Sequence, residues 1–150
     1  MRISEQVFHS LKGTWRLSRS IYDYKNNTDM LKVEGKAEFK EITSNYLEYR
    51  EDVRIVGKNI ESYGEYIYKF EFGRVKVFFC EDNKPTYIYN SLKFEDRGHL
   101  MAHDEHLCKR DKYRSIYHFY DRNRFHTNCK VIGPLKNYEI STLYTKELAH

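Results

Sequence analysis

Apolar and polar residues alternate through most of the chain, and this two-residue period is the feature that most constrains the fold. Trp15, Leu17 and Ile21 share one face of the first such segment, while the stretch "VEGKAEFKEI" sends Ala37 and Phe39 one way and its charges the other. Segments of about 6–10 residues follow one another, separated by turn-like "EDRG", "DRN" and "GPLK". Because no helical pattern comes between them, the pattern predicts an antiparallel meander of about 8–10 strands, which is a sandwich or a closed barrel.

The N-terminus has a different period. Ile3, Val7, Phe8 and Leu11 recur at helical spacing, and Ser4 can cap the first turn. We therefore expect one short amphipathic helix over residues 4–11 in front of the strands. The 150 residues are expected to form a single domain, 1–150, which is long enough to bury a sizeable core.

Composition excludes several classes of function. The 26 basic residues are interleaved with 22 acidic ones, so we expect no nucleic-acid interface. No stretch approaches the roughly 20 apolar residues of a membrane span, and the start "MRISEQVFHS" lacks the apolar segment of a secretion signal. These features lead us to expect a cytoplasmic protein without a membrane partner. The cysteines Cys80, Cys108 and Cys129 have no disulfide or CxxC spacing and are expected to be reduced.

The inner face of the strands is unusually polar. The chain has 14 Tyr and 9 Phe, and Tyr suits a strand whose hydroxyl finds water or a partner. Arg19 shares its face with Trp15, Glu51 shares its face with Tyr49, and Thr142 and Tyr144 share a face of the last strand. Two interpretations are open. Either these groups satisfy one another, with Arg19 and Glu51 forming a buried pair braced by tyrosine hydroxyls, or they line a pocket that holds water or a ligand.

The histidine-rich stretch "GHLMAHDEHLC" suggests three kinds of chemistry. On a strand His99 and His103 face one way while His106 and Cys108 face the other, so four ligands do not converge and we expect no metal site. His106 could instead join Tyr113, Tyr144 or Glu51 in an acid–base set. An inward His106 would also permit haem ligation, or it could be an ordinary core histidine beside a buried thiol.

Three motifs carry a resemblance to a known family. Gly13-Thr14-Trp15 on the first strand after a short helix resembles the lipocalin-like (calycin) barrels. The stretches "HLCKRDKY" and "GPLKNYEISTLYTK" are similar to a family of uncharacterised bacterial domains placed in that superfamily. The resemblance implies an up-and-down barrel whose base is closed by Trp15, with Lys146 packing across the indole ring. It implies no established activity.

The sequence therefore predicts an all-β, antiparallel, calycin-like barrel that binds a small, partly apolar ligand in its interior. Arg19 would anchor an anionic or carbonyl group of that ligand. The predicted ligand-binding residues are Arg19, Tyr49, Glu51, Tyr68, His106, Cys108, Tyr113, Thr142 and Tyr144. The alternatives are an acid–base enzyme of isomerase, cyclase or lyase type that uses the same cavity, a haem-binding barrel, and a protein-interaction barrel with a filled interior. The identity of the ligand or cofactor and the oligomeric state are left open by the sequence.

Overall fold

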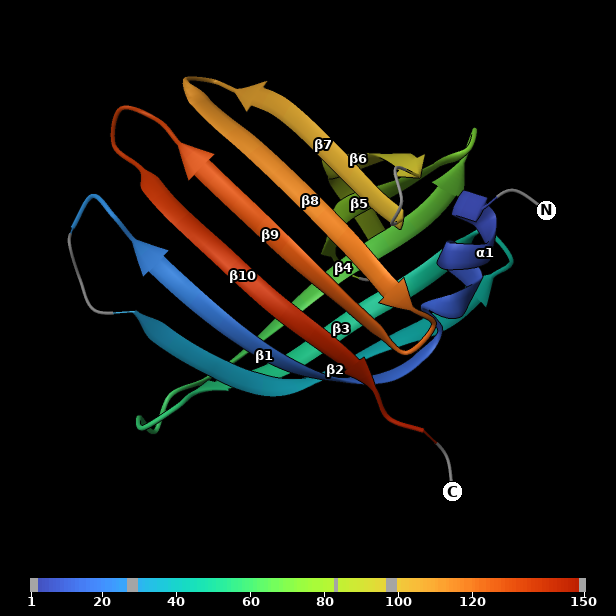
Figure 1. Ribbon diagram of the computed structural model, residues 1–150, viewed down its shortest axis with the longest axis horizontal. Coiled ribbons are helices and arrows are strands. Elements are labelled where there is room, and N and C mark those ends of the chain that lie inside the picture. The colour runs from blue at the N-terminus through green and yellow to red at the C-terminus, as the bar shows by residue number, and fades with distance from the viewer. Residues whose placement is uncertain (1–2, 27–29, 83, 97–99, 149–150) are drawn as a thin grey trace.

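The computed structural model describes residues 3–26, 30–82, 84–96 and 100–148, and these form a closed barrel of ten antiparallel strands with one short helix (Figure 1). The predicted fold class is confirmed. The helix α1 spans Ile3–Ser10, one residue earlier than the predicted 4–11. The strands are β1 (Gly13–Asp23), β2 (Leu31–Thr43), β3 (Tyr46–Ile55), β4 (Glu61–Glu71), β5 (Arg74–Glu81), β6 (Lys84–Asp96), β7 (Leu100–Cys108), β8 (Asp111–Asp121), β9 (Arg124–Ile132) and β10 (Asn137–Lys146).

Each strand pairs with the next in sequence, and β1 closes the barrel by pairing with both β2 and β10. The register sets Trp15 opposite Lys146 and Arg19 opposite Thr142. Since alternate residues of a strand face the same side, these pairs place the inward residues of the first and last strands next to each other.

The helix α1 lies against one end of the barrel, where the chain begins (Figure 1). Its Phe8, together with Leu11 from the turn that follows it, is buried against Trp15, Phe39 and Phe125 in one apolar cluster. This end of the barrel is filled by side chains.

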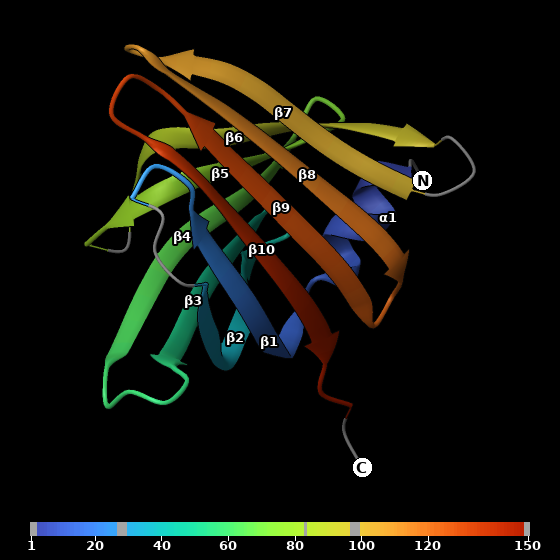
Figure 2. The same cartoon turned by 60° about the vertical axis from the view of Figure 1, so that its left-hand side comes forward.

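The barrel is less regular between β6 and β7. Within the described residues, these strands pair through Lys93–Asp96 and Leu100–His103 alone. The earlier part of β6 is paired with β5, and the later part of β7 is paired with β8. Figure 2 shows β6 and β7 diverging beyond the paired stretch.

Gly35 allows the tight approach of β2 to β3. It sits opposite Val53, and a Cβ at this position would overlap the backbone oxygen of Asp52. A glycine at such a site lets two strands bend together more sharply than any larger residue would allow.

Among the residues that the structure describes, no helix is long and apolar enough to span a membrane. His99 of the histidine-rich stretch lies outside the described residues.

Candidate ligand cavity

The interior of the barrel contains a cavity of about 140 Å³. Strands from around the barrel contribute to its wall. The lining residues are Arg19, Tyr49, Glu51, Tyr66, Tyr68, Val77, Tyr89, Asn90, Ser115, Tyr117, Thr127, Asn128, Cys129, Ile140, Thr142 and Tyr144. Hydroxyl, amide, thiol and charged groups thus share the wall with aromatic rings and a few aliphatic side chains.

Arg19 and Glu51 form a forked ion pair on this wall. The Nη1 of Arg19 donates to Glu51 Oε2 at 2.7 Å and Nη2 donates to Oε1 at 2.9 Å. The Nε donates to Thr142 Oγ1 at 2.9 Å. The side chains of Arg19 and Glu51 are only 16% and 9% exposed. Gly64 lies directly opposite Glu51 on β4, where a Cβ would be in van der Waals contact with Glu51 Cγ at 3.4 Å.

The pair stays ionised. Burial by itself lowers the pKa of Arg19, but the hydrogen bonds to Glu51 and nearby negative charge raise it above its ordinary value. Burial by itself raises the pKa of Glu51, yet the hydrogen bonds and charge of Arg19 and the hydroxyl of Tyr49 lower it overall. Two opposite charges thus share the wall, and they largely cancel within it.

Tyrosine hydroxyls extend this network. Tyr49 Oη donates to Glu51 Oε1 at 2.6 Å and lies 2.9 Å from Tyr144 Oη. Because the single proton of Tyr49 goes to the carboxylate, Tyr144 must be the donor in the second bond. Tyr68 and Tyr117 form a separate hydroxyl pair at 2.9 Å. Burial is the main cause that raises the pKa of each of these four hydroxyls, so they remain neutral.

Strand β6 contributes two lining residues that the sequence analysis did not select. Tyr89 Oη lies 3.2 Å from Cys129 Sγ. Asn90 is only 2% exposed, and its amide nitrogen has no hydrogen-bond partner among the described residues. Val77 pairs with Asn90 but Phe78 pairs with Ile88, so Tyr89 is the extra residue of a β-bulge. The bulge brings two consecutive residues to the cavity, which a strict two-residue period cannot predict.

The structure brings together six of the nine predicted ligand-binding residues. Arg19, Tyr49, Glu51, Tyr68, Thr142 and Tyr144 all line the cavity. The other three, His106, Cys108 and Tyr113, lie beyond it at the β7–β8 hairpin.

His106 is held at that hairpin by local contacts. Its Nδ1 lies 2.8 Å from Asp104 Oδ2, and its ring stacks on Tyr113 at a centroid distance of 5.4 Å. Cys108 is exposed. His106 does lie on the same face of β7 as buried Ala102, but β7 and β8 run past the cavity before they turn. His106 and Tyr113 therefore meet, whereas the expected grouping with Tyr144 or Glu51 does not form.

No group of three or more His, Cys, Asp or Glu residues is placed to hold a metal ion within residues 3–26, 30–82, 84–96 and 100–148. His103 pairs instead with Glu95, at 3.0 Å.

The base of the barrel has the contact implied by the resemblance. Lys146 Nζ lies 5.1 Å from the centroid of the Trp15 ring and donates to the carbonyl of Ser10 at 2.6 Å. The Nε1 of Trp15 donates to the carbonyl of Leu11 at 2.8 Å. Trp15, which is 1% exposed, is thus tied to the end of α1 and to the last strand.

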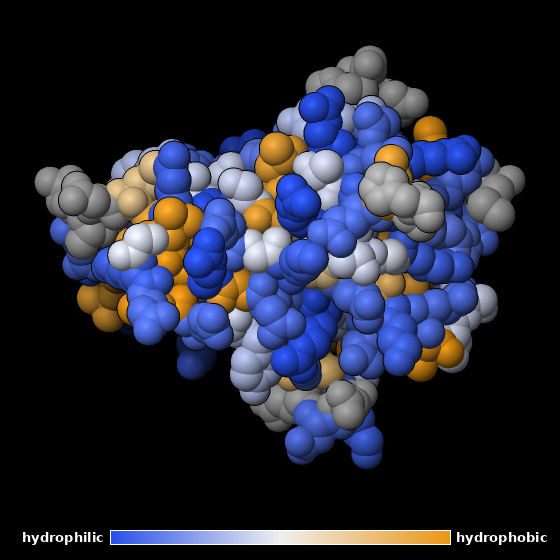
Figure 3. Space-filling model, turned by 90° about the horizontal axis from the view of Figure 1, so that it is seen from below, coloured by the Kyte–Doolittle hydropathy of each residue, from blue (hydrophilic) through white to orange (hydrophobic). Residues whose placement is uncertain are grey.

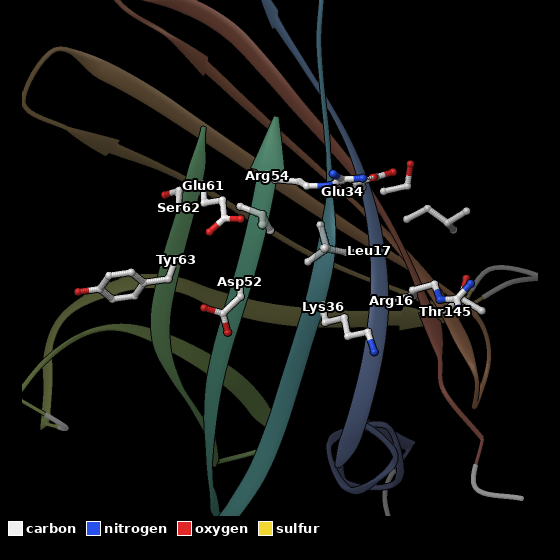
Figure 4. Close-up of a pocket in the computed structure, with 14 residues that line it drawn as sticks. Arg16, Leu17, Glu34, Lys36, Asp52, Arg54, Glu61, Ser62, Tyr63 and Thr145 are labelled. Carbon is white, nitrogen blue, oxygen red and sulfur yellow. Dashed lines mark hydrogen bonds and ion pairs between the residues drawn. The ribbon is translucent and has the colours of Figure 1, made fainter. Parts of the chain in front are cut away.

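A larger hollow of about 930 Å³ lies on the outer face of β1–β4 and β10 (Figure 4). Several of its charges are paired: Arg54 hydrogen-bonds Glu34, and Lys36 and Arg16 pair with Glu147. Figure 3 views the barrel from below relative to Figure 1 and shows a mostly hydrophilic surface, with hydrophobic side chains gathered toward the end away from α1. The interior cavity, with buried polar groups, is the stronger candidate site.

The family model that matches this chain is described as a family of unknown function, DUF6314, and it covers residues 11–146. The chain belongs to the DUF6314 family. The sequence-based expectation of an uncharacterised family with a lipocalin-like barrel is confirmed. No curated protein sequence gives a significant match.

Solved structures share the DUF6314 barrel at low sequence identity. The S-type phycobiliprotein lyase CPES from Guillardia theta has a TM-score of 0.72 at 10% identity, over 97% of this chain and 93% of its own. Rv2717c from M. tuberculosis has a TM-score of 0.71 at 12% identity, over 99% of each chain. EF1p2_mFAP2b, solved bound to DFHBI, has a TM-score of 0.54 at 8% identity, over 96% of this chain and 99% of its own. At these identities the likeness concerns the fold alone.

Proposed function

We propose that this DUF6314 barrel binds a small, partly apolar ligand in its interior cavity. The observation that carries the proposal is the cavity of about 140 Å³ whose wall combines aromatic rings with buried polar groups. A buried polar wall is costly unless its groups find partners, and a bound molecule can supply them. A structural neighbour with the same architecture was solved with the small molecule DFHBI bound, which supports the proposal by analogy of fold.

The cavity volume limits the size of the ligand. An apolar cavity of about 150 Å³ in another protein accepts benzene, so the cavity here suits one ring or a few waters. Haem is far larger, and His106, its proposed axial ligand, does not line the cavity. The haem alternative is therefore disfavoured.

Binding is also favoured over acid–base catalysis. Glu51 is held as a carboxylate by Arg19, while Tyr49 and Tyr144 are held as neutral phenols. A general acid or base works best when its pKa lies near the working pH, and these groups are shifted away from it. The third alternative, an interaction barrel with a filled interior, has no need of a cavity.

The experiment starts with native mass spectrometry of the purified protein, to detect a retained small molecule. Binding of phenol is then followed by protein NMR in wild type and in a series that fills the cavity, Ser115→Thr, Ser115→Val and Ser115→Leu. Ser115 is 3% exposed on the cavity wall, so added methyl groups should weaken phenol binding step by step.

Ser62→Leu is the matched control, because Ser62 is exposed and lines the outer hollow. It should leave phenol binding unchanged. Loss of binding in Ser62→Leu with retention through the Ser115 series would move the site to the outer face and overturn the proposal.

A further inference from the structure

The chemistry of the cavity wall narrows the class of ligand, on the basis of the function proposed above. The sequence led us to expect that Arg19 anchors an anionic or carbonyl group of the ligand. In the structure three N–H groups of Arg19 already donate, two to Glu51 and one to Thr142. The positive charge is matched by a carboxylate within hydrogen-bonding distance. An anion that entered the cavity would lose its hydration and meet Glu51 as well as Arg19, so no net attraction would offset that loss.

Three tyrosine protons on the wall are already used in hydrogen bonds. The proton of Tyr49 goes to Glu51, and that of Tyr144 goes to Tyr49. The hydroxyls of Tyr68 and Tyr117 share one hydrogen bond, so one of their two protons is left over.

Asn90 adds the donors that are most costly to leave unused. Its side chain is almost fully buried, and its amide nitrogen has no partner in the part of the chain that the structure describes. A buried donor without an acceptor destabilises the protein, and in native structures such a group calls for an explanation. A ligand that carries an acceptor oxygen would provide one, with the side-chain amide turning about its last torsion to meet it.

We propose that the cavity takes an uncharged, ring-sized molecule with a carbonyl acceptor, such as a cyclic amide or an aromatic carboxamide, and that Asn90 selects it. The ring lies between tyrosine faces and the aliphatic side chains of Val77 and Ile140. The carbonyl oxygen accepts from Asn90, and the surplus tyrosine hydroxyl provides a second donor.

The test uses three probes built on the same benzene ring: benzamide, benzoate and toluene. Their dissociation constants are measured by protein NMR titration at neutral pH. In wild type, benzamide should bind at least tenfold more tightly than benzoate, because only benzoate brings an uncompensated charge. Benzamide should also bind more tightly than toluene, which has no acceptor for Asn90.

Two variants separate the contributions. Asn90→Leu should weaken benzamide about tenfold, to the level of toluene, since it removes the donor but keeps the side-chain size. Asn59→Leu, at an exposed position on the β3–β4 connection, is the control and should change nothing. Glu51→Gln leaves the charge of Arg19 without its partner and should reverse the order, so that benzoate binds better than benzamide. If Glu51→Gln does not fold, the Asn90→Leu titration decides.

The outcomes distinguish this inference from the proposed function. Benzoate binding wild type as tightly as benzamide, or Asn90→Leu binding all three probes as wild type does, overturns the inference and leaves the function intact. No binding of any probe also overturns the inference. The proposed function fails as well if the purified protein retains no molecule and phenol leaves the cavity resonances unshifted, or if the Ser62→Leu and Ser115 variants place phenol on the outer face.

Discussion

The two halves of the barrel interior differ sharply although the same strands build both. Near α1 the interior is apolar and filled, with the rings of Trp15 and Phe125 packed edge to face at 4.9 Å. Four residues further along β1, on the same face, Arg19 enters a polar network around a cavity. One face of one strand thus serves packing at one end and recognition at the other. Position along the strand, rather than the face, separates the two roles.

The largest expected effect lies in the packed half. Trp15→Ala should lower the free energy of unfolding by about 4–5 kcal/mol, the upper part of the range for aromatic truncations in a core. The substitution also removes the hydrogen bond to Leu11 and the contact with Lys146. Urea denaturation monitored by circular dichroism measures it. A loss under about 2 kcal/mol would contradict the assignment of Trp15 to a close-packed base.

The polar half should lose almost as much stability when one charge of its ion pair is removed. Arg19→Met leaves Glu51 buried without its partner and should cost about 3–4 kcal/mol at pH 7. In wild type the pKa of Glu51 is lowered from its ordinary value of 4.5. The ionised carboxylate therefore contributes folding stability that is fully present above pH 4.5 and is lost as pH falls through the folded-state pKa. In Arg19→Met the partnerless, buried Glu51 has a raised pKa, so the variant regains stability as pH falls toward 4.5. The difference in stability between wild type and Arg19→Met should therefore narrow as pH falls from 7 and narrow further below about pH 4.5.

The double variant Arg19→Met with Glu51→Leu serves as the control for this prediction. It removes both charges and should recover much of the stability that Arg19→Met loses. If the double variant is no more stable than Arg19→Met, the ion pair does more for the barrel than keep each buried charge from being unpaired.

A smaller effect is expected from one hydroxyl of the network. Tyr49→Phe removes the donor to Glu51 and the acceptor of Tyr144, and should cost about 2 kcal/mol. Tyr63→Phe is the control, because Tyr63 is 66% exposed and its hydroxyl faces solvent outside the barrel. Equal stabilities of the two variants in urea titrations would argue that the buried network adds nothing.

The smallest effect belongs to the lysine at the base. Lys146→Met should cost about 1 kcal/mol, through loss of the cation–π contact with Trp15 and of the hydrogen bond to Ser10. The same change at Lys32, which is exposed on β2, should be neutral. Thermal unfolding of both variants beside wild type checks the prediction, and a neutral Lys146→Met would show that Trp15 alone closes the base.

Much of the architecture was predictable because alternation is local. The period of two from Gly13 onward determined which side chains face inward, and it gave Arg19, Tyr49 and Glu51 correctly as inward residues. Both open interpretations of these residues describe part of the result, since Arg19 and Glu51 do pair and a cavity is nevertheless present. His106 illustrates the limit of the method. Its face follows from alternation, but its distance from the cavity depends on how far β7 and β8 extend beyond it.

The sequence by itself determined the class of fold and the polar character of the interior, and the resemblance to calycin barrels implied the closing pair Trp15 and Lys146. Tertiary structure alone decided three further things: that the charge of Arg19 is matched by Glu51, that the remaining space is about 140 Å³, and that a bulge brings Tyr89 and Asn90 to it together. The physical reason is that alternation along a strand is local, so the face to which a side chain points can be read from adjacent residues in the sequence. Charge compensation and cavity volume depend instead on which side chains are in contact across the barrel. Strand register and bulges determine those contacts.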